Sequence, residues 1–365
     1  MTVRALLRDF DWVMFGTVAA VLLLGLLTLY SASRQSGSEV AASHHLRQAV
    51  WTCVGLCVML TVVRIDYHRF LAFAPLLYAV VLLALILVLV LPSRGGAARR
   101  WLNLGPLHIQ PSEFCKVAVV LLLARYFSAV KIKIRRPRFF IGALAIVALP
   151  MMLIVREPDL GTALVFVPVM LVMLYLAGSK MRHLVSVCLL GCASSPLLWN
   201  FLEGYQKRRL LAFIKPEVDP LGWGYQTIQS KIAVGSGSFL GKGWLRGTQS
   251  RLNFLPAQHT DFVFSVYSEE WGFIGAALLL GLFAVIIARG METTLRARDF
   301  SGNILAGGLV TLLACHILMN IAVVLGLMPV TGLPLPLMSY GGSSLVSMMA
   351  LIGLLINIRI RSRMF

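Results

Sequence analysis

The sequence predicts an all-α integral membrane protein, built as a single polytopic domain of ten transmembrane helices over residues 1–365. Hydrophobic residues make up 58% of the chain and charged residues only 13%, against about 25% in soluble domains. Apolar runs long enough to cross a bilayer recur along the whole length. The mean hydropathy is +0.83, so the net charge of +18 indicates membrane topology rather than nucleic-acid binding.

Ten apolar runs have the length that a membrane-spanning helix requires. The fourth run is short and carries Glu113, Lys116 and Arg125, so we expect it to face protein or water rather than lipid. No internal repeat is visible, which counts against an inverted-repeat transporter. The ten runs lie near 12–31, 48–64, 70–91, 112–129, 139–155, 160–178, 183–201, 262–288, 302–325 and 340–358.

Basic residues orient these helices. Seventeen of the 33 Lys and Arg residues fall in short segments on alternate turns of the chain. The positive-inside rule makes those segments cytoplasmic, which predicts that both termini lie in the cytoplasm. The connection between the seventh and eighth helices, about 202–261, is then a long periplasmic loop.

This outer loop has a basic surface of its own, with eight Lys and Arg residues that the topology rule does not explain. They predict an anionic partner outside, such as a phosphate-bearing substrate or a lipid head group; the alternative is a solvated basic loop. The spacing of apolar residues in 225–234 predicts an amphipathic helix. The glycines at 235–247, which surround Lys242, are a weak signal for a phosphate cradle.

Asp261 is the most informative residue, because it places a carboxylate at the mouth of the eighth helix. A charged group costs roughly 2.5–3.5 kcal/mol at full membrane depth, so such a residue usually has a role. The alternative is that Asp261 caps the helix. Glu113 and Lys116 lie three residues apart and share a helix face, either as an ion pair that locks the helix or as the lining of a polar cavity.

Two further polar segments fall on the predicted outer side. Residues 156–162 link the fifth and sixth helices, where Asp159 or Thr162 could act as a helix cap. Residues 332–344 are irregular backbone at membrane depth, which is tolerated only in protein or along a cavity. A carboxylate can accept a proton from a sugar hydroxyl, and basic residues can neutralise a pyrophosphate leaving group. The outer face therefore suits transfer of a group from a phosphorylated lipid.

Over nearly its whole length the chain resembles the SEDS family of bacterial peptidoglycan polymerases. Within the family, residues 241–250 are most similar to the RodA branch, the elongation polymerases, rather than to the FtsW branch. One departure is Ala257-Gln258, where the family often has an acidic residue. The motifs that carry the resemblance lie at 100–105 with 110–113, 157–162, 224–231, 254–262 and 334–343.

The resemblance implies a glycosyltransferase that polymerises lipid II on the periplasmic face of the bacterial cytoplasmic (inner) membrane, during cell elongation and rod-shape maintenance. Asp261 would be the general base and undecaprenyl pyrophosphate the leaving group. Glu113 and Lys116 would line the cavity. The partners would be a class B penicillin-binding protein, which is a transpeptidase, and other elongation-complex membrane proteins. Candidate substrate contacts are Arg47, Arg100, Gln206, Arg209, Lys231 and His259.

Three questions stay open at this point. Clustered acids near a pyrophosphate would permit Mg²⁺ or Mn²⁺, but no metal ligand set is legible. A lipid II flippase would need charges at mid-depth and on the inner side, whereas the acids in or beside the spans cluster at the outer end. A non-catalytic scaffold for a penicillin-binding protein would tolerate Asp261→Asn.

Overall fold

The computed structural model describes residues 8–35, 44–91, 100–104, 107–215, 222–252, 254–255 and 257–363. Within these ranges ten long helices coincide with the ten predicted segments, and seven of them are long and apolar enough to cross a membrane. The chain is therefore a multi-pass helical membrane protein. The long helices are α2 (Trp12–Gln35), α4 (His44–Arg64), α5 (Tyr67–Val90), α6 (Pro111–Val130), α7 (Pro137–Arg156), α8 (Leu160–Leu176), α9 (Met181–Phe201), α13 (Val263–Arg296), α14 (Phe300–Val324) and α15 (Gly342–Arg363).

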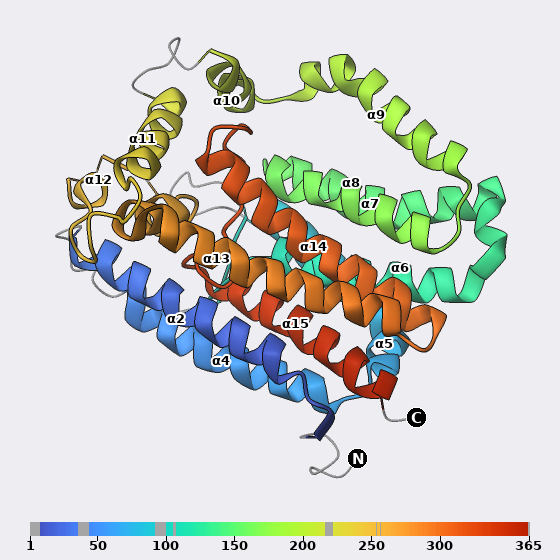
Figure 1. Ribbon diagram of the computed structural model, residues 1–365. Coiled ribbons are helices and arrows are strands. Elements are labelled where there is room, and N and C mark those ends of the chain that lie inside the picture. Colours follow the sequence, from blue (N-terminus) through green and yellow to red (C-terminus); the bar gives the residue numbers. More distant parts are fainter. Residues whose placement is uncertain are drawn as a thin grey trace.

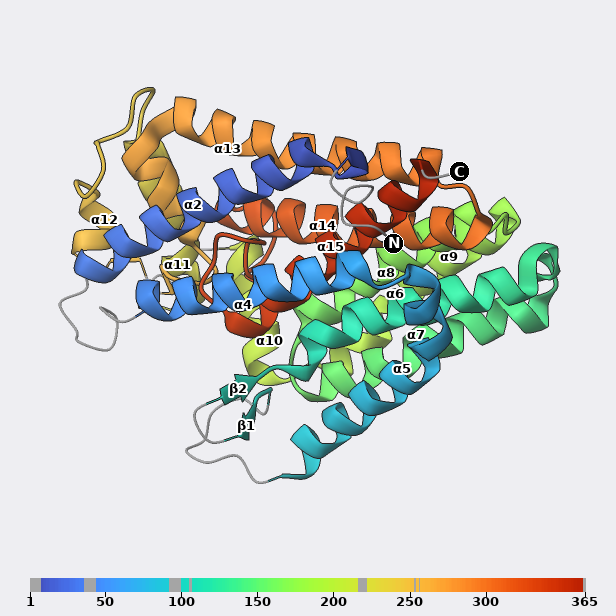
Figure 2. The ribbon, with the colours of Figure 1, turned by 90° about the horizontal axis from the view of Figure 1, so that it is seen from below.

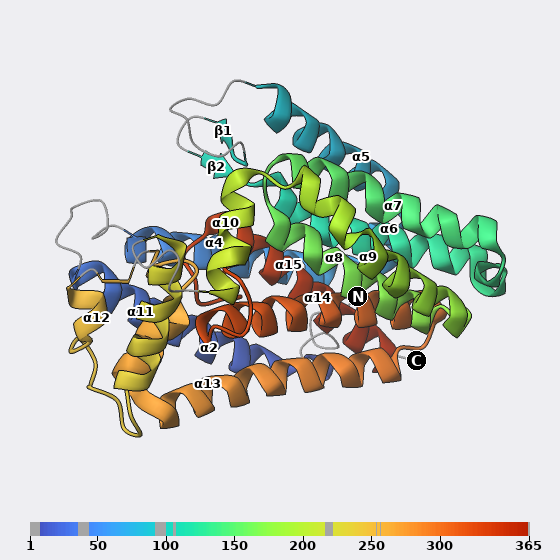
Figure 3. The ribbon, with the colours of Figure 1, turned by 90° about the horizontal axis from the view of Figure 1, so that it is seen from above.

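The long helices form a bundle with two different ends (Figure 1). The start of α2 and the end of α15 lie near each other at one end, the inner end. The other, outer end carries α10 (Gly204–Ile214), α11 (Trp223–Ser236) and α12 (Thr248–Arg251). An antiparallel hairpin of β1 (Leu102–Leu104) and β2 (Leu107–Ile109), which the sequence did not predict, also lies there. Figure 3 shows α5 and α13 at opposite edges of the bundle.

The centre of the bundle is made by α6, α14 and α15, which pack against one another. The close approach of α4 to α15 requires glycine, because a Cβ on Gly353 would lie 2.9 Å from the Met59 carbonyl oxygen. Most of α6 is buried in spite of its charged residues. The expectation that this helix faces protein rather than lipid is therefore confirmed.

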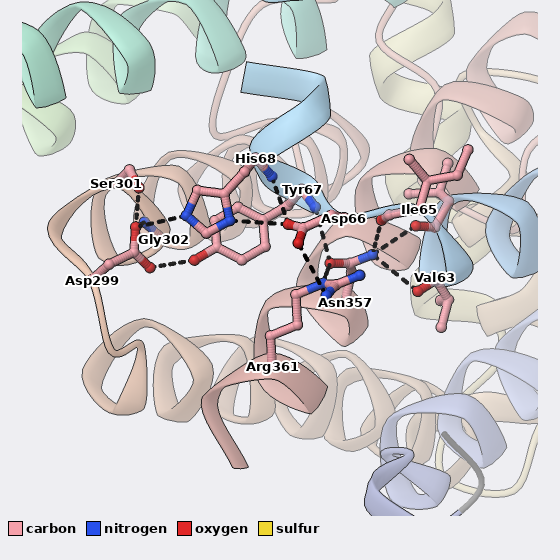
Figure 4. A network of polar contacts seen from close by, with 11 residues as sticks. Val63, Ile65, Asp66, Tyr67, His68, Asp299, Ser301, Gly302, Asn357 and Arg361 are labelled. Carbon is pink, nitrogen blue, oxygen red and sulfur yellow. Dashed lines mark hydrogen bonds and ion pairs between the residues drawn. The ribbon is translucent and has the colours of Figure 1, made fainter. Parts of the chain in front are cut away.

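A network of polar contacts at the inner end ties the α4–α5 and α13–α14 connections to helix α15 (Figure 4). His68 lies between two carboxylates, 2.9 Å from Asp66 and 3.5 Å from Asp299. Arg361 of α15 pairs with Asp66 at 3.1 Å, and Asn357 donates to two carbonyls at the end of α4 at 2.8 and 3.0 Å. Burial raises the pKa of Asp66, but hydrogen bonds from His68 and the charge of Arg361 outweigh it and leave that pKa below 3.8.

The glycine-rich part of the outer loop packs on the start of α13. The backbone N–H groups of Lys242 and Gly243 donate to the carbonyls of Glu269 and Glu270, both at 3.0 Å. Gly272, with φ of 63°, allows the kink in α13 that this contact needs. The Lys242 ammonium lies 2.7 Å from the buried Glu269 carboxylate. The expectation of a phosphate cradle is therefore wrong, since its amides and its lysine bind α13 instead.

Candidate active site

Asp261 lies in the last turn of the outer loop, immediately before α13. The N-cap residue of α13 is Phe262, and no side chain makes a capping hydrogen bond there. The interpretation of Asp261 as a helix cap is therefore wrong. Its carboxylate is partly buried and lies beside Gly332, where a Cβ would be 3.8 Å from Oδ2. Gly332 has φ of 74°, the left-handed conformation that favours glycine, so a glycine allows this turn beside the carboxylate.

Three successive carbonyls, those of residues 259–261, are each held by a donor from the C-terminal part of the chain. The Tyr340 N–H donates to the first at 2.8 Å and the Ser339 hydroxyl to the second at 2.5 Å. The Asn320 side-chain amide donates to the third, the carbonyl of Asp261, at 2.9 Å. The backbone that carries the Asp261 side chain is therefore fixed at every residue by contacts from α14 and the irregular segment 332–344.

The irregular segment is itself anchored by buried amides. Gln48 of α4 donates to the Ser339 carbonyl at 3.0 Å and accepts from the Gly341 N–H at 3.1 Å. Asn320 also donates to the Leu333 carbonyl at 2.8 Å. Neither amide was predicted from the sequence. The signal that could have found them is an uncharged polar residue inside an otherwise apolar span, which usually has a bonding partner.

Two arginines surround Asp261 with positive charge. Burial raises the pKa of the Asp261 carboxyl above 3.8, and the nearby Asp159 raises it further. Arg209 and Arg100 act in the opposite direction. Burial, and then repulsion from Arg100, lower the pKa of Arg209 below 12.5. Asp261, Asp159 and the two arginines therefore form one electrostatic group, and the sequence had pointed to all four residues, Asp159 as a possible helix cap.

The turn after α7 holds Arg100 directly and Tyr205 through a hydrogen bond, and Tyr205 contacts Arg209, which also donates to the Val330 carbonyl at 3.4 Å. Arg100 donates through Nε to the Glu157 carbonyl at 3.1 Å and through Nη2 to the Pro158 carbonyl. The hydroxyl of Tyr205, in α10, donates to the same Pro158 carbonyl at 2.7 Å. Arg209 lies over the Tyr205 ring, 5.5 Å from its centre. Two cations from separate parts of the chain are thus brought to one turn.

The carboxylates of this turn have different environments. Asp159 caps α8, since it accepts from the Thr162 N–H at 3.2 Å and hydroxyl at 2.9 Å, which confirms the capping alternative. Glu157 is fully buried, and neither of its side-chain oxygens has a hydrogen-bond partner among the described residues. Burial, with repulsion from Asp159, raises the pKa of Glu157 to about 8. This environment favours the protonated form of Glu157, although the charge of Arg100 acts in the opposite direction.

Glu113 and Lys116 form a buried ion pair at 2.8 Å in α6, and each side chain is 2% exposed or less. His316 of α14 lies 2.9 Å from the Lys116 ammonium, and Ser347 of α15 contacts Glu113 at 3.5 Å. The pair therefore links the three central helices. Of the two readings from the sequence, the contacts match the ion pair that locks a helix, because Lys116 is already engaged on two sides.

The remaining candidates are dispersed over the outer end. Gln206 is buried and accepts from the Glu203 N–H at 2.9 Å, which caps α10. His259 is partly buried beside His44, and burial lowers its pKa to about 4. Arg47 and Lys231 are exposed. Among the described residues no group of three His, Cys, Asp or Glu side chains could hold a metal ion, so we derive no step through one.

Comparison with known proteins places the chain in a family. A family model described as "Cell cycle protein", covering FtsW, RodA and SpoVE, matches residues 11–364. The peptidoglycan glycosyltransferase MrdB of Escherichia coli is 39% identical over 355 residues, which is 97% of this chain and 94% of that protein. The peptidoglycan glycosyltransferase RodA of Treponema pallidum is 34% identical over 427 residues, which is 97% of this chain and 98% of that protein.

Solved structures agree with these relatives. A structure described as "Structural coordination of polymerization and crosslinking by a peptidoglycan synthase complex" has a TM-score of 0.82 at 32% identity, and covers 98% of this chain and 99% of that one. The rod shape determining protein RodA of Thermus thermophilus has a TM-score of 0.72 at 31% identity, and covers 98% of each chain. The fold and the sequence motifs therefore place the chain in the same family.

Proposed function

We propose that this chain, which belongs to the cell cycle protein family of FtsW, RodA and SpoVE, is a peptidoglycan glycosyltransferase. It polymerises lipid II into glycan strands during cell elongation and rod-shape maintenance. The observation that carries the proposal is the Asp261 carboxylate, which has no capping role, is held by its backbone at three successive carbonyls and has two arginines nearby. The names of relatives at 34–39% identity over nearly the whole chain support the same activity.

Asp261 acts as the general base in this reaction. Its carboxylate accepts the proton of the acceptor sugar hydroxyl, and the hydroxyl oxygen forms a bond to the anomeric carbon of the donor sugar. The bond from that carbon to the phosphate oxygen breaks, and its electron pair leaves with undecaprenyl pyrophosphate. Burial raises the pKa of Asp261, which makes the carboxylate a stronger base than an exposed aspartate.

Arg100 and Arg209 stabilise the leaving group. Guanidinium groups bind phosphate oxygens through paired N–H donors, and they neutralise the charge that develops as the glycosidic bond breaks. Both arginines are oriented before substrate binds, by the turn after α7 and by Tyr205. Arg47, Lys231 and His259 lie at the same end of the chain's helices, and we propose that they contact more distant parts of the substrate.

The membrane arrangement follows from the two ends of the bundle. We propose that all ten long helices span the cytoplasmic (inner) membrane, with the inner end and both termini in the cytoplasm and with Asp261 facing the periplasm. The start of α2 and the end of α15 lie at the same end of the bundle (Figure 1), which supports this, as does the basic character of the inner connections in the sequence. Lipid II would then enter from the outer leaflet.

A class B penicillin-binding protein is the proposed partner, with other elongation-complex membrane proteins around the pair. The support is the structural similarity to a chain from a peptidoglycan synthase complex described as coordinating polymerization and crosslinking. A transpeptidase beside the polymerase would cross-link each new strand. We also propose that polymerisation depends on a divalent cation, Mg²⁺ or Mn²⁺. Adding the metal to the polymerisation reaction and removing it with a chelator would test this dependence.

The test is polymerisation of fluorescent lipid II by the purified protein with its penicillin-binding partner. We expect glycan ladders from the wild type and none from Asp261→Asn, which keeps the shape of the side chain and removes the base. Asp66→Asn is the matched control, because it neutralises an aspartate at the inner end. Equal ladders from Asp261→Asn would exclude Asp261 as the base. Lipid II scrambling in liposomes without any ladder would favour a flippase.

A further inference from the structure

Tyr205 connects the two arginines that flank Asp261. Its hydroxyl donates to the Pro158 carbonyl at 2.7 Å, the carbonyl that Arg100 also binds through Nη2. The face of its ring carries the Arg209 guanidinium, whose central carbon is 5.5 Å from the ring centre. One side chain in α10 therefore contacts one cation directly and reaches the other through a shared acceptor.

The two cations repel each other. Arg100 is close enough to Arg209 to act on its protonation equilibrium, and both side chains are partly buried. Holding two like charges together in a poorly solvated site costs free energy, unless a ligand with two negative groups occupies the space between them. A diphosphate has two such groups, and each guanidinium can bind phosphate oxygens through paired N–H donors.

We propose that Tyr205 is a positioning residue, which holds Arg100 and Arg209 as a preformed pair for the diphosphate of the lipid-linked substrate. The inference rests on the proposed function for its substrate but not for its geometry. Arg209 lies one turn after Tyr205 in α10, while Arg100 precedes the β1–β2 hairpin. The pair therefore exists only while α10 is docked against the turn after α7, and Tyr205 makes that contact.

The two parts of the tyrosine can be tested separately. Tyr205→Phe removes the hydroxyl but keeps the ring under Arg209, and we expect KM for lipid II to rise roughly 2- to 10-fold, as for loss of one hydrogen bond. Tyr205→Leu also removes the ring, and we expect a further rise of roughly 2- to 10-fold from the lost cation–π contact. Tyr225→Phe, in the neighbouring helix α11, is the matched control and should leave KM unchanged.

Pyrophosphate binding separates this inference from the proposed activity. Calorimetric titration of the whole protein with inorganic pyrophosphate should show weaker binding in both Tyr205 variants, with inorganic phosphate as the comparison that carries a single phosphate group. In an Arg209→Met background, Tyr205→Leu should have no more effect than Tyr205→Phe, because the ring acts through that guanidinium. Unchanged KM and unchanged pyrophosphate affinity in folded Tyr205→Phe and Tyr205→Leu would overturn the proposal, even if the wild type polymerises lipid II.

Discussion

The buried pair of Glu113 and Lys116 gives a prediction with a large and calculable effect. The two charged atoms are 2.8 Å apart and the side chains are almost fully buried. Lys116→Met keeps the volume and removes the cation, which leaves the buried Glu113 carboxylate, among the residues that the structure describes, with Ser347 at 3.5 Å as its one side-chain partner. Breaking a buried pair from one side costs about 3–5 kcal/mol, because an uncompensated charge remains.

The free energy of unfolding can be measured by SDS titration in mixed micelles. We expect Lys116→Met to lose about 3–5 kcal/mol and the double variant Glu113→Gln/Lys116→Met to regain most of that loss, since no unpaired charge is left. Arg296→Met is the matched control. Arg296 pairs with Glu292 on an exposed helix surface, where such a contact is worth about 0–1 kcal/mol.

Two results would contradict this reasoning. A loss in Lys116→Met as small as that in Arg296→Met would mean that water reaches the pair. Strictly additive losses in the double variant would mean that each side chain acts through packing alone, with no coupling between the charges.

Three further predictions concern protonation and positioning. The rate of lipid II polymerisation should fall as the pH drops through the pKa of Asp261, which lies above 3.8, because only the ionised carboxylate accepts a proton. Arg209→Met removes a positive charge that lowers this pKa, so the acid-side fall in rate should occur at higher pH in that variant. Between pH 4.5 and about 8 the folded chain keeps the Glu157 proton and the unfolded chain releases it, so the free energy of unfolding of the wild type should fall as the pH rises through this range. Glu157→Gln should remove this pH dependence and be more stable than the wild type at pH 8 in unfolding titrations. Asn320→Leu leaves two carbonyls at the site unpaired and should lower kcat at least about tenfold, whereas Asn357→Leu, which frees carbonyls at the inner end, should reduce stability with kcat of the folded protein unchanged.

The fold was largely predictable because membrane helices are determined by local composition. A run of apolar residues must form a helix in a bilayer, since each backbone polar group needs a partner within the same segment. All ten predicted segments therefore appear as helices in the described residues. The boundaries were less accurate where charged residues continue the helix, as in α13, which extends to Arg296 rather than to residue 288.

The site was predictable only in part. Asp261 and its two arginines could be named from residue type and from resemblance, because charge at a membrane boundary is costly and therefore rare. The pairing of Lys242 with Glu269 could not be named, since the two lie 27 positions apart in the sequence and meet only where the glycine-rich loop packs on the start of α13. The same holds for Tyr205, whose hydroxyl could have faced water in any other docking of α10.

The sequence by itself determined the ten helices, the basic outer loop and the identity of the candidate base. The tertiary structure alone decided which polar groups meet: Asn320 with the Asp261 carbonyl, 59 residues away, and Gln48 with Ser339, 291 residues away. The physical reason is that the two kinds of interaction act over different distances along the chain. Hydrophobic transfer acts on each segment independently, whereas a hydrogen bond exists only when folding brings its donor and acceptor to within about 3 Å.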